Sequence, residues 1–221
     1  MVEIATSLLS IDKQNIIKDI YDLEVAGTDY FHIDVMDGKF VKNNTTDVMM
    51  EYTEYIKQVS NTKIEVHLMV ENVEEYVKQY IDMDVDCIMF HIESLKTEDE
   101  IFNMINEIKD NNVKVGITLN PDTDIEKVYK FIPYIHRILI MSVVPGEGGQ
   151  EFMQESVSKI EKLKQYIDKS KNDIDIEVDG GINDNTAEKV MNAGANILVV
   201  GSYICKSDNY AERIQKIKDR I

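Results

Sequence analysis

The sequence predicts an α/β protein that folds as a closed barrel of eight parallel strands, with a helix after each strand. Short runs rich in β-branched residues alternate with longer segments of helical period, which is typical of a parallel sheet with crossover helices. Eight such runs occur within 221 residues, and a (β/α)8 or TIM barrel needs roughly 200 to 250 residues. No stretch is rich enough in Pro, Gly or Ser to be a linker, so we expect one domain over residues 1–221. A doubly wound open sheet is the alternative that this alternation leaves open.

Eight segments are expected to be strands, because each is short, rich in β-branched residues and bounded by turn-forming residues. They are Glu3–Leu8, Tyr30–Val35, Lys63–Leu68, Asp86–Ile92, Val113–Leu119, Arg137–Ser142, Ile174–Val178 and Ile197–Val200.

The segments between these strands carry helix signals. An apolar stripe over residues 16–23 predicts the first helix, which ends at Gly27. The helix after the seventh strand begins with an N-cap at Asn183 or Asp184 and ends at Gly194.

Side chains alternate along a strand, so one set faces the helices and the other faces the barrel axis. In the second strand Phe31, Ile33 and Val35 form an apolar set, whereas His32 and Asp34 belong to the other set. The third and seventh strands alternate in the same way. We expect the apolar sets to face the helix layer, which turns the ionisable sets inward.

Three charged residues lie nearer to the starts of strands that should be apolar on both faces: Glu65, Lys114 and Glu177. Burying a charge costs several kcal/mol unless the charge is paired. We therefore expect these residues to form structural ion pairs low in the barrel.

Four side chains of the metal-ligating types lie at or near the C-terminal ends of their strands, where barrel enzymes carry their active sites: His32, Asp34, His67 and Asp179. His32 and Asp34 are two residues apart and point to the same side, and the strands of His67 and Asp179 are close by in the ring. Two imidazoles and two carboxylates can converge there on one divalent ion. This donor set suits zinc, iron, manganese or cobalt better than calcium. A metal-free acid/base cluster is the alternative.

Two carboxylates on different sides of a metal ion suit proton transfer next to a ketone. One removes the proton, the ion stabilises the resulting enediolate, and the other returns a proton to the opposite face and inverts the carbon. Asp34 and Asp179 therefore predict a metal-dependent epimerase. Return of the proton by the same group would give an isomerase instead.

Glycine-bearing loops follow the last three expected strands, at Pro145–Gly149, Gly180-Gly181 and Gly201-Ser202. Loops after the seventh and eighth strands of barrels commonly bind phosphate through backbone N–H groups. Glycine allows that close approach, although turns need glycine too. Three such loops at consecutive strand ends favour a phosphate-binding site.

The formal net charge of −17 disfavours nucleic acid and anionic membranes as partners. No apolar run is long enough to span a bilayer, and a basic N-terminal region followed by an apolar stretch is absent, so we expect a cytoplasmic protein. Cys87 and Cys205 have neither metal-ligand nor redox spacing, which agrees with a reducing compartment. As partners we expect a small-molecule sugar phosphate and further copies of the chain in a homo-oligomer.

Four segments carry a resemblance to a known family: His32–Gly38, Val66–Met69, Met141–Gly146 and Glu177–Gly181. They resemble the motifs of ribulose-phosphate 3-epimerases, and the match extends over residues 4–202. The resemblance implies a TIM barrel of the ribulose-phosphate-binding type. It also implies interconversion of D-ribulose 5-phosphate and D-xylulose 5-phosphate, a reaction of carbohydrate metabolism in the pentose phosphate pathway.

The resemblance also implies roles for individual residues. One divalent metal ion would be bound by His32, Asp34, His67 and Asp179, and the two aspartates would be the catalytic acid/base pair. Substrate contacts would come from a larger set: Ser7, Met36, His67, Met69, Met141, Gly146, Glu147, Gly148, Gly149, Gly180, Gly181, Gly201 and Ser202.

Glu147 departs from the family pattern, which has an aromatic residue at this place in the phosphate loop. A carboxylate there weakens phosphate binding unless it turns to solvent or pairs with a cation. The alternatives are therefore an epimerase of a ketohexose 6-phosphate such as D-allulose 6-phosphate, and a non-catalytic sugar-phosphate-binding barrel. Gly180-Gly181 favours the pentose enzyme, because the hexose relatives tend to have serine second, and the intact Asp34 and Asp179 favour an enzyme.

Overall fold

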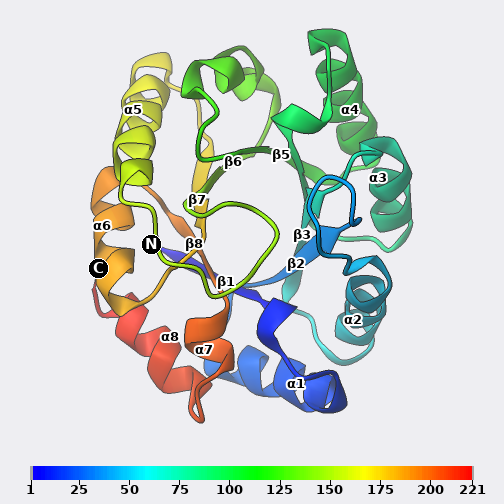
Figure 1. Cartoon of the computed structure of the whole chain (residues 1–221), viewed down its shortest axis with the longest axis vertical. Helices are drawn as coiled ribbons and strands as arrows, with labels where there is room; N and C mark the ends of the chain where they lie inside the picture. The colour runs from blue at the N-terminus through cyan, green and yellow to red at the C-terminus, as the bar shows by residue number, and fades with distance from the viewer. Residues whose placement is uncertain (1, 221) are drawn as a thin grey trace.

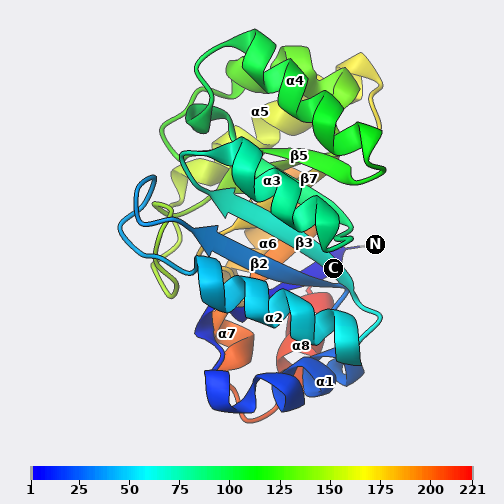
Figure 2. The same ribbon diagram turned by 90° about the vertical axis from the view of Figure 1, so that its right-hand side faces the viewer.

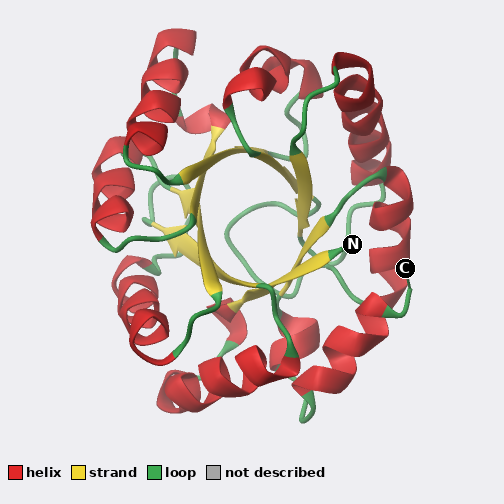
Figure 3. Ribbon diagram, turned by 180° about the vertical axis from the view of Figure 1, so that it is seen from behind, coloured by secondary structure: helices red, strands yellow, loops and turns green. Residues whose placement is uncertain are grey.

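The computed structural model describes residues 2–220 as a closed barrel of eight parallel strands, paired in chain order from β1 to β8 and back to β1. Figure 1 looks along the barrel, and Figure 3 shows the ring of strands from behind with the helices outside it. The strands are Glu3–Ser7 (β1), Tyr30–Met36 (β2), Lys63–Met69 (β3), Cys87–His91 (β4), Lys114–Leu119 (β5), Arg137–Met141 (β6), Asp175–Asp179 (β7) and Ile197–Val200 (β8). Every strand boundary lies within one residue of the predicted one, so the predicted TIM barrel is confirmed and the open sheet is excluded.

Helices connect the strands on the outside of the barrel (Figure 3). They are Ile16–Ala26 (α1), Thr46–Val59 (α2), Val73–Asp82 (α3), Glu98–Asp110 (α4), Glu155–Ser170 (α5), Asp184–Ala193 (α6), Ser202–Cys205 (α7) and Tyr210–Lys218 (α8). The connection after β5 is a 3₁₀ helix, Ile125–Tyr134, which contains Pro133. Among residues 2–220, no helix combines the length and apolar character that crossing a membrane requires.

The predicted helix ends follow from local chemistry. Gly27 ends α1 in the left-handed conformation with φ 89°, where a residue with a side chain would be strained. Asn183 caps α6, because its side chain accepts the backbone N–H groups of Asn185 and Thr186. Asn183 thus sets where the loop after β7 ends at the barrel mouth, whereas Gly27 ends α1 at the opposite end of the barrel, before β2.

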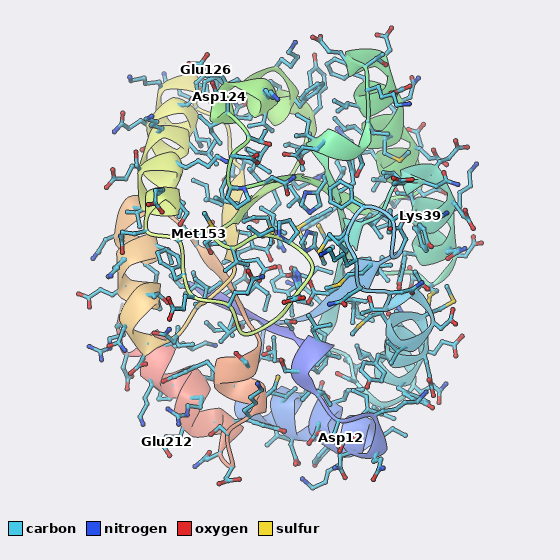
Figure 4. All side chains as sticks on the ribbon, viewed as in Figure 1. Asp12, Lys39, Asp124, Glu126, Met153 and Glu212 are labelled. Carbon is cyan, nitrogen blue, oxygen red and sulfur yellow. The ribbon has the colours of Figure 1, made fainter. Side chains whose placement is uncertain are left out.

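Apolar side chains form two layers, one outside and one inside the ring of strands. Phe31, Ile33 and Val35 are fully buried in the cluster between strands and helices, as their alternation predicts. A smaller cluster inside the ring includes Leu139 and Val199. Figure 4 shows side chains filling the ring, whereas labelled charged residues such as Asp12 and Glu212 lie at the periphery.

Buried ionic groups lie inside the barrel below its mouth. The Arg137 guanidinium contacts Glu65 and lies 2.9 Å from Glu177 Oε2, and all three side chains are almost completely buried. The predicted ion pairing of Glu65 and Glu177 is thus confirmed. The prediction for Lys114 is wrong, because this residue is exposed at the start of β5, and Arg137 from the start of β6 supplies the positive charge.

Arg137→Leu should destabilise the protein by about 3–5 kcal/mol, because it leaves two buried carboxylates without their cation. Urea unfolding measures this loss. Arg220→Leu is the control, since Arg220 lies at the surface 3.9 Å from Asp184 and its loss should change the free energy of unfolding by at most about 1 kcal/mol. Equal stability of the two variants would contradict the proposed charge balance.

Candidate active site and metal centre

The structure brings the four predicted metal ligands together at the barrel mouth. His32 and Asp34 come from β2, His67 lies beside Asp34 on β3, and Asp179 ends β7. One ligand atom from each of these residues can be chosen so that all lie within 4.8 Å of one another. Both histidines are fully buried, and Asp34 is 4% exposed. The convergence predicted from strand alternation therefore holds in three dimensions.

Distances within this group are suited to a shared divalent ion. Oδ1 of Asp34 lies 3.4 Å from Nε2 of His32 and 3.3 Å from Nδ1 of His67. Oδ2 of Asp179 lies 3.7 Å from the same His67 nitrogen. Nε2 of His32 is buried and has no hydrogen-bond partner among residues 2–220. Because an unsatisfied buried nitrogen is costly, this atom fits a ligand to a metal ion.

The other ring nitrogen of His32 is held by a carboxylate. Nδ1 lies 2.7 Å from Oε1 of Glu65, and the second oxygen of Glu65 contacts Arg137. A histidine that donates one N–H to a carboxylate has a fixed tautomer and a more basic second nitrogen. The buried ionic group below the mouth thus orients His32 toward Asp34.

The two aspartates have opposite protonation preferences in the metal-free protein. Burial alone would raise the pKa of Asp34, but the neighbouring His32 imidazole holds that pKa well below its usual range. Ser7 also donates a hydrogen bond of 2.6 Å to Asp34 Oδ2. Burial and the nearby charge of Asp34 raise the pKa of Asp179 to about 8. One carboxylate is therefore charged and the other protonated at neutral pH, which is the arrangement of a base and an acid.

A cavity of about 480 Å³ opens above the aspartates, within the usual range for small-molecule sites. Its wall includes Asp34, Asp179 and nearly all of the predicted substrate-binding residues: Ser7, Met36, Met69, Met141, Gly146, Glu147, Gly148, Gly149, Gly180, Gly181, Gly201 and Ser202. His67 is the exception, because it is fully buried and is not part of that wall. The cavity thus joins the aspartates to the glycine loops.

The glycine loops require glycine at their closest approach. Gly180 has φ 122°, and a Cβ there would lie 2.5 Å from Cγ2 of Val143. Gly181 has φ 65°, and its Cβ would lie 2.6 Å from the backbone N of Phe152. Both positions combine a left-handed backbone with close packing, so the loops after β6 and β7 lie against each other in the cavity wall.

Glu147 lies in the cavity wall but is open to solvent. The residue is exposed, forms no ion pair within residues 2–220, and its backbone carbonyl accepts a hydrogen bond of 2.9 Å from Gln150. Sequence analysis missed a cation, Lys206, that also lines the cavity. Its position one helical turn after Ser202 is a signal that could have identified it.

A second loop closes the side of the mouth. The segment after β2 lies beside the loop after β6, as Figure 2 shows at the left of the molecule. Nδ2 of Asn43 donates a hydrogen bond of 2.7 Å to the carbonyl of Gly146. The carboxylate of Asp37 fixes the same segment, because it accepts the backbone N–H groups of Lys39, Phe40 and Glu71. The loop after β6 is thereby tied to β2, which carries two of the predicted metal ligands.

Solved structures with the same fold are distant in sequence. KGPDC from Streptococcus mutans superposes with a TM-score of 0.74 at 13% identity, covering 100% of this chain and 97% of its own. A 3-hexulose-6-phosphate synthase superposes with a TM-score of 0.71 at 12% identity, covering 99% of each chain. At these identities the likeness concerns the barrel fold alone.

Sequence relatives are much closer. The ribulose-phosphate 3-epimerase of Methanocaldococcus jannaschii is 37% identical over 219 residues, covering 99% of this chain and 91% of its own. The enzyme of the same name from Bacillus subtilis is 36% identical over 219 residues, which cover 99% of this chain and 99% of its own. The model of the ribulose-phosphate 3-epimerase family matches residues 3–205. The chain therefore belongs to the ribulose-phosphate 3-epimerase family of isomerases.

Proposed function

We propose that this protein interconverts D-ribulose 5-phosphate and D-xylulose 5-phosphate by removing and returning the proton at C3. The observation that carries this proposal is the pair of aspartates, Asp34 and Asp179, which both line the cavity and lie within 4.8 Å of each other. The names of the close relatives support the same substrate.

The two aspartates would act from opposite faces of the substrate carbon. One carboxylate removes the C3 proton, and the other returns a proton to the other face, so the carbon is inverted. Each such group contributes about 10²- to 10⁴-fold to the rate. Ser7 holds Asp34 by a hydrogen bond and also lines the cavity, where it can reach a substrate hydroxyl.

His32, Asp34, His67 and Asp179 would hold one divalent ion, of zinc, iron, manganese or cobalt. When bound, that ion supplies positive charge that stabilises the enediolate oxygens. The unpartnered nitrogen of His32 and the mixed nitrogen and oxygen donors support this assignment.

The glycine loops would bind the phosphate through backbone N–H groups. A chain with a net charge of −17 repels a phosphorylated substrate at long range, so local donors must provide the affinity. Lys206 lines this part of the cavity and adds a positive charge, whereas the exposed Glu147 opposes binding through a solvent-screened interaction.

The expected partners beyond the substrate are further copies of the chain. Ile17, Tyr21 and Val25 form an exposed apolar stripe on α1, with 51%, 59% and 70% exposure, and such stripes often mark interfaces. We therefore propose a homo-oligomer. Free Cys87 and Cys205 support a cytoplasmic location, because reducing compartments keep thiols unpaired.

The metal-loaded protein should turn over D-ribulose 5-phosphate with a kcat/KM about 10-fold or more above that for D-allulose 6-phosphate. The expectation comes from Gly181, which occupies the position where the hexose-phosphate relatives tend to have serine. Coupled assays of both substrates measure the ratio. A larger value for the hexose phosphate would reverse the substrate assignment, and no turnover of either would favour a non-catalytic binder.

Asp34→Asn and Asp179→Asn should each lower exchange of the C3 proton with solvent deuterium by at least about 10²-fold, because each removes one proton-transfer group. Mass spectrometry of the sugar phosphate in D2O follows the exchange, and circular dichroism follows the fold. Asp175→Asn is the control on the same strand, since Asp175 lies at the other end of β7 and accepts a hydrogen bond from Asn196. Unchanged exchange in either active-site variant would refute the acid/base assignment.

Removing divalent metal with a chelator should abolish turnover and lower the unfolding temperature, and one equivalent of metal per chain should restore both. Binding of an ion at about 100 times its Kd stabilises the folded state by about 2.7 kcal/mol. Metal analysis, activity and thermal unfolding measure the three quantities on one sample. Full turnover in protein with less than a tenth of an equivalent of metal would contradict a metal-dependent mechanism.

A further inference from the structure

His67 makes contacts through both of its ring nitrogens, and only one of these nitrogens faces the candidate metal centre. Nδ1 lies 3.3 Å from Asp34 and 3.7 Å from Asp179. Nε2 lies 2.9 Å from Nε2 of His91, which ends β4. The two ring planes are within 25° of each other, so the N–H of one ring can point at the lone pair of the other.

His91 in turn contacts a carboxylate. Its Nδ1 lies 3.3 Å from Oε2 of Glu93. The other oxygen of Glu93 accepts the backbone N–H of Asn120 at 3.0 Å and the hydroxyl of Thr123. Burial alone would raise the pKa of Glu93, but hydrogen bonds from His91 and Thr123 hold that pKa below its usual value, so the group is a carboxylate.

With both imidazoles neutral, these contacts have one consistent set of protons. A carboxylate can only accept, so His91 donates from Nδ1 to Glu93. A neutral His91 then has a bare Nε2, which accepts a hydrogen bond, and His67 must be the donor from its own Nε2. The result is a lone pair on Nδ1 of His67, the nitrogen that faces Asp34 and Asp179.

Without the contacts to His91 and Glu93, the opposite tautomer of His67 would be favoured. The charged Asp34 lies 3.3 Å from Nδ1 of His67, and a carboxylate attracts an N–H. A proton on Nδ1 would block that nitrogen as a ligand, because a metal binds the unprotonated imidazole nitrogen. His91 is fully buried and Phe40 packs on it at 4.8 Å, so solvent does not supply an alternative partner.

We infer that Glu93 and His91 are positioning residues that keep the proton of His67 on Nε2 and so leave Nδ1 free to bind a metal ion. This inference rests on the proposed metal-dependent function. It concerns residues outside the cavity wall, which touch neither the substrate nor the ion.

Glu93→Gln tests the inference because an amide at this position must reverse the direction of the hydrogen bonds between His67, His91 and residue 93. The backbone N–H of Asn120 requires an acceptor, so the oxygen of the new amide faces Asn120 and its NH2 group faces His91. His91 then accepts at Nδ1 and carries its proton on Nε2, which faces His67. His67 must accept there and hold its own proton on Nδ1. Metal affinity should fall about 10- to 100-fold.

Two readouts follow this change. Competition with a coloured chelator measures the affinity for zinc or manganese. Nitrogen NMR of the metal-free protein, labelled at its histidines, shows which ring nitrogen of His67 carries the proton. Glu100→Gln is the control, because it removes the same charge from another carboxylate that accepts backbone N–H groups, at the start of α4. Both readouts should match the wild type in this control.

The wild-type spectrum provides a test that does not depend on folding of the variant. The metal-free protein should carry the proton of His67 on Nε2 and that of His91 on Nδ1. A proton on Nδ1 of His67, or unchanged zinc affinity in folded Glu93→Gln, would overturn the inference while the proposed function stands. A wild-type protein that binds neither metal would instead refute the proposed metal centre.

Discussion

The structure depends on compensating the charges that the barrel buries along its axis. Arg137 neutralises Glu65 and Glu177 below the mouth, and Glu65 in turn holds His32, which faces Asp34. Each charged group is the hydrogen-bond partner of the next, so the ionic interior is a connected column rather than a set of separate pairs. At the top of the column, no Lys or Arg within residues 2–220 pairs with Asp34 or Asp179, and Nε2 of His32 has no hydrogen-bond partner. A divalent ion would complete the column, because its charge offsets the two carboxylates.

The barrel fold makes this column possible. Eight parallel strands place their C-terminal ends around one mouth, so residues that are more than a hundred positions apart in sequence become neighbours, such as Asp34 and Asp179. The rigid strands carry the acids and the imidazoles, whereas the loops carry the glycines that line the cavity. The strands thus position the candidate proton-transfer groups, and the loops shape the candidate phosphate site.

Both histidines of the candidate metal centre are linked to a carboxylate, one directly and one through another residue. His32 contacts a carboxylate directly, whereas His67 reaches Glu93 through a second imidazole. In both cases the partner lies on or just beyond a neighbouring strand, so the barrel that positions the two histidines also brings a carboxylate to each of them, directly or through His91. The family relationship explains why the acids and glycines occur together, and the contacts explain what each of them requires from its surroundings.

The sequence by itself determined the positions of the strands. Apolar residues recur with a period of two residues in strands and 3.6 residues in helices, and this recurrence shows which face of each element is buried. It also determined that His32 and Asp34 point the same way, since two residues make one full period of a strand. Only the tertiary structure decided that Arg137 rather than Lys114 enters the interior: Arg137 pairs in register with Gly116, which has no side chain to fill that space. Only the tertiary structure brought Lys206 to the cavity and Glu93 to His91, because these contacts depend on how loops from separate units fold back. Periodicity fixes the direction of a side chain, whereas its partner is fixed by the stagger of strands and the course of loops.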